Sequence, residues 1–374
     1  MKNYLNRLTI IKMIIVVAFI SVATIFAFNN SRFYDEPIGK ITKIETKHVQ
    51  KEKKSKDENY LQSMTIKLMN TKEAGTVYSY KSSYTTSQFR TTKYHKGQYV
   101  FLKKNISKKN GGYGKYGLKI MGEKYDFVWA FMISSLISLI FLIAGRRAIL
   151  ILASIAMNLV VFAIGIMKIV KFKDIYSLTL IMTAIFIIAT LILLYGFSKK
   201  SIGAIFSSVT TVLIVLGIYM VIIHFSGRLG YEYIDYTNGN EPLEELFVSS
   251  LVFSILGAVM DVAITINSSV EEIVVSGGAK SLKEIINSIK GISNDIMGTM
   301  INVLFFTFVG DEIPINILKM ANGYNMITLF SNGAAFEVIR FLIGAIGIAL
   351  AVPVSGFFAV VLRARMIRRG GETC

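Results

Sequence analysis

Long apolar runs alternate with short lysine-rich segments along most of this chain. About 20 helical residues cross the hydrocarbon core of a bilayer, and eight runs approach or exceed that length. The expected spans are residues 9–28, 127–144, 148–167, 176–197, 201–223, 247–266, 296–309 and 336–362. The pattern predicts an α-helical polytopic membrane protein with about eight transmembrane helices.

The first run follows Lys2 and Arg7, a basic start that a cleaved signal peptide would share. The run is longer than the apolar core of a usual signal peptide, and Ala27 is followed by Phe28 instead of a small-residue cleavage site. Residues 1–29 are therefore expected to form an uncleaved N-terminal transmembrane anchor.

Residues 30–126 have a different pattern. Polar and apolar residues alternate over 64–68, and a Tyr/Val/Phe run over 99–102 follows a Lys-Gly turn. A second turn signal, Asn-Gly-Gly at 110–112, precedes another short run. Short strands with glycine turns predict a small β domain, with a partly open barrel as one form of it.

The composition supports a membrane protein. Apolar residues make up 53% of the 374 positions and charged residues only 17%, which excludes a single water-soluble enzyme core. The net charge is +17, and residues 30–126 carry 21 Lys and Arg against 9 Asp and Glu. Basic loops in a membrane protein set orientation and contact anionic lipid, so no nucleic-acid partner is expected.

Loop charge predicts the topology. Basic pairs at 146–147 and 199–200 and the tail at 363–374 are expected in the cytoplasm, which places both termini there and residues 30–126 outside. Lys168, Lys171 and Lys173 form the exception, because this scheme puts them outside. Residues 127–362 are then a seven-helix membrane domain.

Two segments do not fit simple spans. Residues 267–294 mix apolar and charged positions and are broken by Gly277-Gly278, so they are expected to lie as amphipathic helix in the cytoplasmic interface. Residues 314–335 contain too many asparagines for lipid contact, and an interfacial position and a re-entrant one both remain open.

Asp261 lies inside an otherwise apolar span. On a helix it shares one face with Gly257 and Thr265. An intramembrane carboxyl group usually lines a cavity, forms an ion pair or relays protons, and we favour such a role. The alternative is a protonated Asp261 that hydrogen-bonds a neighbouring helix to fix its packing.

The next span carries Asp295, Thr299 and Asn302 at helical spacing, which predicts a second polar stripe. Asp295 has a plain alternative, because an acid in a first turn is favoured by the helix dipole.

The last span opens with Glu337 and Arg340, three residues apart, which are expected to pair at the outer interface or to line an outer cation pathway. Gly344 and Gly347 further along predict close helix approach, and Pro353 predicts a kink.

Catalytic and metal-binding motifs are missing from the sequence. Cys374 is the only cysteine, and His48, His95 and His224 show no ligand spacing. No P-loop, GxSxG elbow or zincin motif occurs. The sequence therefore predicts neither an enzyme nor a metal or cofactor site.

Three blocks resemble the YibE/F family of bacterial membrane proteins. They are GAVMDVAITINSSVEEI (257–273), NDIMGTMINVLFFTFVGDEIP (294–314) and AFEVIRFLIGAIGIALAVPVSGFFA (335–359). The resemblance implies a multi-spanning plasma-membrane protein of permease type. It assigns no substrate and no catalytic residue.

Two functions are consistent with these patterns. The first is a secondary transporter or exporter of an unknown solute, coupled to protons through Asp261 with Thr265, Thr299 and Asn302 around it. The alternative is a non-transporting envelope scaffold, receptor or assembly factor, whose basic outer domain contacts anionic wall polymers or lipid head groups. The lipid bilayer is the expected partner in both cases. The sequence leaves open whether the chain forms a homo-oligomer or a hetero-oligomer.

Overall fold

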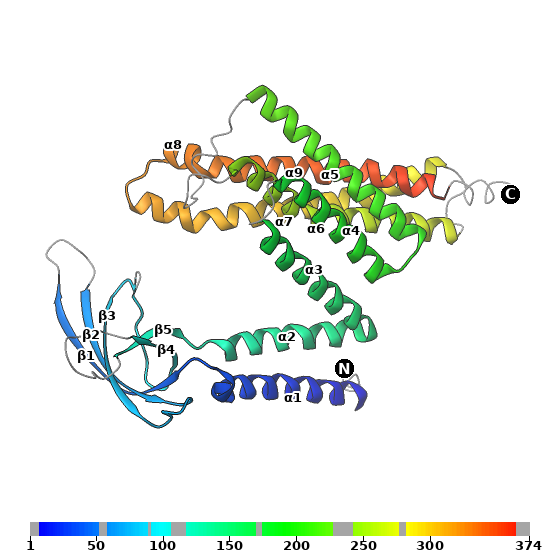
Figure 1. Ribbon diagram of the computed structural model, residues 1–374. Helices are drawn as coiled ribbons and strands as arrows, with labels where there is room; N and C mark the ends of the chain where they lie inside the picture. The colour runs from blue at the N-terminus through cyan, green and yellow to red at the C-terminus, as the bar shows by residue number, and fades with distance from the viewer. Residues whose placement is uncertain are drawn as a thin grey trace, which may run out of the picture. The chain divides into compact units, whose positions relative to one another are not determined.

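A computed structural model describes residues 7–51, 58–88, 91–105, 117–169, 174–226, 242–276 and 282–363 of the chain. The chain divides into two compact units, Met1–Ala148 and Ile149–Cys374. The first unit combines helices with one β-sheet, and the described part of the second is helical (Figure 1).

The first unit contains a five-stranded antiparallel sheet in the order β3-β2-β1-β4-β5. Its elements are α1 (Arg7–Asn29), η1 (Asn30–Phe33), β1 (Ile38–Lys51), β2 (Glu58–Leu68), β3 (Val77–Thr85), β4 (Tyr99–Asn105), β5 (Gly117–Glu123), α2 (Asp126–Ala144) and η2 (Gly145–Arg147). Register shifts in β1 bend that strand, and the edge strands β3 and β5 approach each other. The sheet is therefore a half-barrel, which confirms the expected small β domain.

The alternating pattern of the strands produces the core of this half-barrel. Met64, Ile66 and Leu68 on β2 point inward with 1% exposure each. They pack against Ile41 of β1 and Leu102 of β4. The polar residues between them face outward, as the sequence pattern predicts.

A buried lysine joins the sheet to the helices of the first unit. The Lys124 side chain is 1% exposed, and its Nζ lies 2.8 Å from Oδ1 of Asp126 at the start of α2. The same Nζ donates to the carbonyl oxygen of Ala27 in α1 at 2.7 Å. Asn30 and Tyr34 donate to Oδ2 of Asp126 at 2.9 and 3.0 Å. This network compensates the buried lysine and the partly buried Asp126, and it links α1, α2 and the end of β5.

The second unit is built around α6 and α9. Its elements are α3 (Ala148–Ile169, whose first residue belongs to the first unit), α4 (Ile175–Tyr195), α5 (Lys199–Ser226), α6 (Leu243–Val275), α7 (Leu282–Ala321), α8 (Met326–Leu329), the π-helical turn η4 (Phe330–Ala334) and α9 (Ala335–Val361). Helix α6 packs against α4, α5, α7 and α9, and α9 packs against α5, α6 and α7. Among the described helices, α6 accordingly has the largest number of buried apolar residues.

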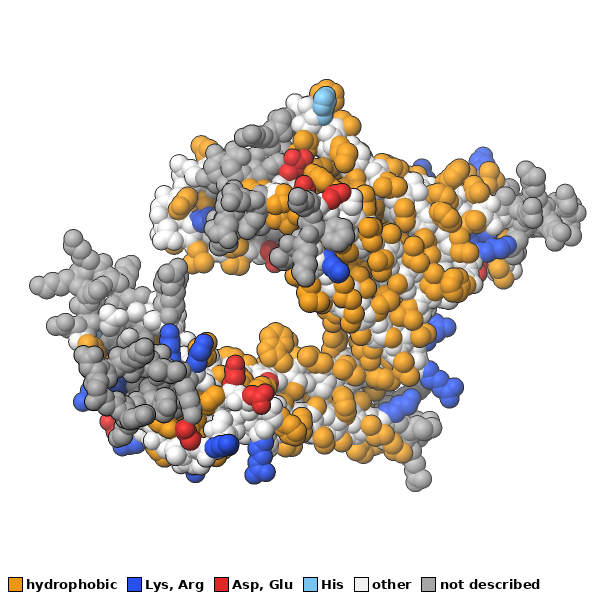
Figure 2. Space-filling view, in the orientation of Figure 1, with side chains coloured by type: hydrophobic (Ala, Val, Ile, Leu, Met, Phe, Trp, Pro, Cys, Tyr) orange, Lys and Arg blue, Asp and Glu red, His pale blue; other side chains and the backbone are white. Residues whose placement is uncertain are grey.

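Seven helical stretches in the described residues are long and apolar enough to cross a membrane. One of them, Asp126–Lys168, contains both α2 and α3, which the sequence pattern treats as two spans. In the stretch Ile10–Phe33, only 6% of the most apolar part is buried inside the protein. The remaining apolar side chains therefore need an apolar solvent such as lipid. Figure 2 shows hydrophobic side chains over the helical surface in view. The protein is an integral membrane protein.

Glycines bring α6, α7 and α9 close together. A Cβ atom at Gly344 would lie 2.6 Å from a Leu304 methyl group and 2.9 Å from Ile255. A Cβ atom at Gly347 would lie 2.9 Å from Val215 of α5. The close approach expected of these two glycines is confirmed.

The contacts also give the helix directions. Phe247 of α6 contacts Phe336 of α9, and eight residues further along each helix Ile255 lies beside Gly344. Helices α6 and α9 therefore run parallel. Helix α7 is antiparallel to both. Its Phe305 contacts Phe341 of α9, whereas its earlier residue Ile289 lies beside the later Gly356.

Residues 267–294 differ from the expected interfacial segment. Residues 267–275 continue α6, and residues 282–294 begin α7. Val270 and Ile285 are fully buried in one apolar cluster of the helix bundle, so protein instead of lipid covers these positions. The expected break at Gly277-Gly278 lies outside the described residues.

Residues 314–335 form the end of α7, the short helix α8, the turn η4 and the first residue of α9. Helix α7 continues through Pro314 to Ala321, and α8 follows after a turn. Asn325 caps α8, since its Oδ1 accepts from the Thr328 backbone N–H at 2.8 Å. Helix α9 likewise continues past Pro353 to Val361.

Candidate functional site

A cavity of about 520 Å³ lies between α6, α7 and α9 in the second unit. Its charged lining consists of Asp261, Asp311, Glu312, Glu337 and Arg340. The other lining side chains are small or apolar, with Ser254 and Thr307 as the hydroxyl groups. The volume falls in the range of small-molecule sites, and the charged groups come from three helices.

Small residues on α6 create the hollow. Gly257 lines the cavity, and a Cβ atom built there would meet no atom within 4 Å. Ser254 and Ala258 line the same wall. The helix spacing that aligns Gly257 with Asp261 therefore places the carboxyl group beside open space.

The cavity extends along the helix axes. Ile255, Leu304 and Gly344 meet at one level. Asp261 lies six residues beyond Ile255, or about 9 Å at 1.5 Å per residue. Glu337 precedes Gly344 by seven residues, about 10 Å in the opposite direction. Asp261 therefore lies at one end of the cavity and the Glu337 group at the other.

Glu337 and Arg340 form an ion pair at their end. Arg340 Nη1 donates to both Glu337 carboxylate oxygens at 2.7 and 2.8 Å. The two side chains are 18% and 17% exposed. The guanidinium carbon lies 5.3 Å from the Phe247 ring centre and 5.6 Å from that of Phe308. Arg340 is thus held by a carboxylate and two aromatic rings.

Asp261 and Thr265 form a separate polar group. The Thr265 hydroxyl donates to the Asp261 backbone oxygen at 2.7 Å, and Asp261 lines the cavity whereas Thr265 does not. Within the described ranges no hydrogen bond or ion pair involves that carboxylate.

The second predicted stripe does not join the cavity. Asp295, Thr299 and Asn302 are exposed on α7 and are not among the lining residues. The Thr299 hydroxyl donates to the Ile296 backbone oxygen at 2.8 Å, and the Asn302 amide donates to the Gly298 oxygen at 2.9 Å. Their helix satisfies these side chains.

Two lining carboxylates, Asp311 and Glu312, were missed by the sequence reasoning. Gly310 before them and Pro314 after them are typical of a helix end, so the expected span stopped at Val309. The spacing of Leu304, Thr307 and Asp311 is that of one continuous helix face and was the available signal.

The carboxylates are too dispersed to form a metal centre. Among the described residues, no group of three or more His, Cys, Asp or Glu side chains is arranged to hold a metal ion.

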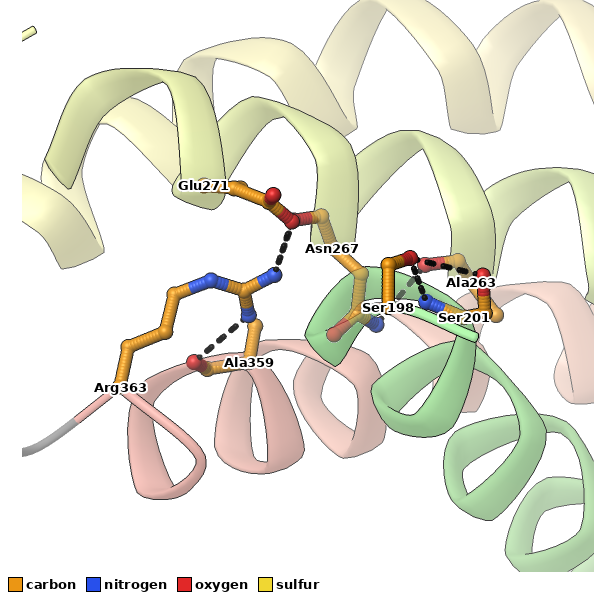
Figure 3. A network of polar contacts seen from close by, with 7 residues as sticks. All are labelled: Ser198, Ser201, Ala263, Asn267, Glu271, Ala359 and Arg363. Carbon is orange, nitrogen blue, oxygen red and sulfur yellow. Dashed lines mark hydrogen bonds and ion pairs between the residues drawn. The ribbon is translucent and has the colours of Figure 1, made fainter. Parts of the chain in front are cut away.

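A second polar network joins α6 and α9 at their C-terminal ends (Figure 3). The Arg363 side chain is 1% exposed, and its Nη2 donates to the Asn267 backbone oxygen at 3.0 Å and to Glu271 Oε2 at 2.9 Å. Its Nη1 donates to the Ala359 oxygen at 3.0 Å. Arg363 was expected in the cytoplasmic basic tail, and the structure buries its side chain against α6 and α9, where three acceptors satisfy its charge.

Comparisons with known proteins identify the family. The family model described as YibE/F-like protein matches residues 132–365, and the YibE/F family N-terminal domain matches residues 32–120. No curated protein and no solved structure matches the chain. The first match covers the helical bundle that holds the cavity, and the second covers the half-barrel. The chain therefore belongs to the YibE/F family.

Proposed function

We propose that the protein is a secondary transporter of the bacterial plasma membrane, coupled to protons through Asp261. One observation carries the proposal: the cavity between α6, α7 and α9 joins an intramembrane carboxylate to a charged group at its far end. The resemblance to permease-type membrane proteins is consistent with it.

The charge of the cavity favours cations. Four carboxylates and one guanidinium group line it. A low-dielectric cleft lined mainly by one sign of charge concentrates ions of the opposite sign. Among the lining carboxylates of the described residues, only Glu337 forms an ion pair. We assign the proton step to Asp261 because it lies inside an apolar span, at the end of the cavity away from Arg340.

The loop charges give this proposal a direction. With both termini in the cytoplasm and the half-barrel outside, the Glu337 end of the cavity faces outward. Asp261 then lies deeper in the membrane. A solute or proton from the outer side would meet Glu337 and Arg340 before it reaches Asp261.

A proton-flux measurement tests the proposal. The purified full-length protein is reconstituted into liposomes that contain a pH-sensitive dye, and a pH step is applied with the membrane potential clamped. We expect flux in the wild type and a fall to the rate of protein-free liposomes in Asp261→Asn. This substitution keeps the side-chain size and removes the titratable group.

Asp295→Asn is the matched control. Asp295 is also an exposed acid in a long helix of the same unit, but it does not line the cavity. Its variant should retain wild-type flux. Equal flux in wild type and Asp261→Asn, or equal loss in both variants, would refute coupling through Asp261.

A second candidate function rests on the half-barrel. Lys40 and Lys67 are direct cross-strand partners, and so are Lys103 and Lys119. Like charges placed opposite each other destabilise a sheet, so these pairs are more easily explained by an anionic partner. A scaffold or receptor that binds a phosphate-rich envelope polymer fits this feature. In that case Asp261→Asn would be nearly silent for function.

A further inference from the structure

A second cavity adjoins the cavity of about 520 Å³ between α6, α7 and α9, which we call the acidic cavity. It has a volume of about 290 Å³ and lies between α7, α8 and the start of α9. Its walls are mainly apolar and include Ile313, Ile317, Met320 and Met326. We call it the apolar vestibule. Long flexible methionine side chains suit apolar ligands of variable shape.

Two carboxylates separate the vestibule from the acidic cavity. Glu312 and Glu337 line both. Asn316 lies on the vestibule side and donates to Glu312 at 3.3 Å. A molecule that passes from the vestibule into the acidic cavity must therefore pass these two acids.

The contacts of Arg340 indicate which kind of charged group is stabilised between the two cavities. Its planar guanidinium lies near the rings of Phe247 and Phe308 and pairs with Glu337. Its Nε is buried and has no hydrogen-bond partner in the described structure. A weakly hydrated, delocalised cation is the kind of group that such a carboxylate and aromatic setting favours.

The remaining acids lack such a cation. Asp261, Asp311 and Glu312 line the acidic cavity together with the Glu337–Arg340 pair. A second cation would therefore find carboxylates to compensate it, whereas an anion would be repelled. A small hydrated metal ion is disfavoured, because the described residues offer no metal-ligand group and the vestibule walls are apolar.

We propose that the apolar vestibule and the acidic cavity form one binding route for an amphiphilic organic cation. The apolar body of the ligand occupies the vestibule, and its charged centre competes with Arg340 for Glu337 and then reaches Asp261. This inference rests on the proposed transporter function and names its substrate class.

A pair of probes with nearly the same shape and opposite charge tests the substrate class. Tetraphenylphosphonium and tetraphenylborate are each equilibrated with the purified full-length protein in detergent micelles, and binding is measured by dialysis against protein-free micelles. We expect saturable binding of the cation near one per chain. Tetraphenylborate should show only the unsaturable uptake of empty micelles.

Three variants locate the bound cation. Glu312→Gln should weaken tetraphenylphosphonium binding by about tenfold or more, since it removes a carboxylate that lines both cavities. Asp261→Asn should weaken it by only about threefold, because Asp261 lies at the opposite end of the acidic cavity. Glu312→Gln leaves the Glu337–Arg340 pair in place, so it avoids exposing an unpaired arginine. Asp295→Asn should bind within about twofold of wild type, because Asp295 lines neither cavity.

The outcomes separate this inference from the proposed function. Saturable cation binding that depends mainly on Glu312 supports the route even if no proton flux is found. Proton flux without saturable tetraphenylphosphonium binding keeps the transporter and overturns the substrate class. Equal binding of the two probes, or wild-type binding in both cavity variants, also overturns it.

Discussion

At Gly203 in α5, a neighbouring side chain decides which residue fits. A Cβ atom there would overlap Oδ1 of Asn267, which is fully buried in α6, and would lie 3.3 Å from Leu362. Asn267 cannot easily move, because its amide donates to the Ala263 oxygen at 2.9 Å and its own backbone oxygen accepts from Arg363. The polar network in Figure 3 therefore requires glycine at this point.

The first prediction follows from this contact. Gly203→Ala should lower the free energy of unfolding by about 1–3 kcal/mol, the usual cost of overpacking a well-packed core. Thermal unfolding of the detergent-solubilised protein, followed by intrinsic fluorescence, measures the change.

Gly217 on the same helix provides the control. A Cβ atom there meets nothing within 4 Å. Gly217→Ala should therefore be neutral or stabilise by up to about 1 kcal/mol, because alanine is the better helix former. The overlap at Gly203 would be unimportant if the two variants had the same melting temperature.

Arg363 makes a related point about single residues. The sequence places it first in a run of basic residues, where the positive-inside rule suffices to explain it. Its burial beside Glu271 depends on how α6 and α9 align at their ends. Residue type alone carries no signal that separates this arginine from those that follow it.

At the scale of elements, α4 shows how a local signal begins a membrane helix. Asp174 precedes Ile175, and its carboxylate accepts from the Ser177 hydroxyl at 2.6 Å and from the Ser177 backbone N–H at 3.2 Å. These hydrogen bonds from Ser177 hold the pKa of Asp174 below its ordinary value of 3.8. The ionised form is the better helix cap.

The pH dependence of this cap can be measured. Because the folded pKa of Asp174 is depressed, its stabilisation is present above the unfolded pKa and is lost as pH falls through the folded value. Asp174→Asn keeps a cap acceptor without the charge. We expect the variant to melt below wild type at pH 7 and the gap to close below about pH 3.8. A gap that stays constant across this range would contradict the assignment.

Helix α7 shows the limit of hydropathy as a guide to element ends. Its most apolar stretch predicts a short span, whereas the helix is 40 residues long, from Leu282 to Ala321. Near its end, Asp311 and Glu312 line the cavity beside α9, whereas Pro314 is exposed. An element that packs against protein can include residues that lipid would exclude.

At the scale of the whole molecule, the two units carry different chemistry. The half-barrel presents paired lysines on its outer face, and the helical bundle encloses carboxylates. The cross-strand pair Lys40 and Lys67 lies next to Tyr99, over which the Lys40 ammonium sits at 5.2 Å. An anionic partner would relieve the repulsion within this pair.

A charge reversal tests that interpretation. Lys67→Glu should convert the repulsive pair into an attractive one and stabilise the sheet by about 0.2–1 kcal/mol. Slower hydrogen exchange of the β1 and β2 amides in the full-length protein would show it. If the lysine face binds a phosphate polymer, the same variant should bind inorganic polyphosphate more weakly.

Lys72→Glu serves as the comparison, because Lys72 is exposed and lies in the turn that follows β2. It should leave hydrogen exchange in β1 and β2 unchanged. Faster exchange in Lys67→Glu than in wild type would show that the lysine pair is not a cost to the sheet.

The sequence by itself determined the membrane class, the positions of the long apolar helices and the β character of residues 30–126. These features follow from hydrophobicity and side-chain period, which act over a few neighbouring residues. Asp261, Glu337 and Arg340 were recognisable because charge inside an apolar span is locally costly. Their meeting in one cavity with Asp311 and Glu312, the exclusion of Asp295 and the burial of Arg363 were decided by tertiary structure. The reason is that the rotation, alignment and end of each helix depend on the helices packed against it.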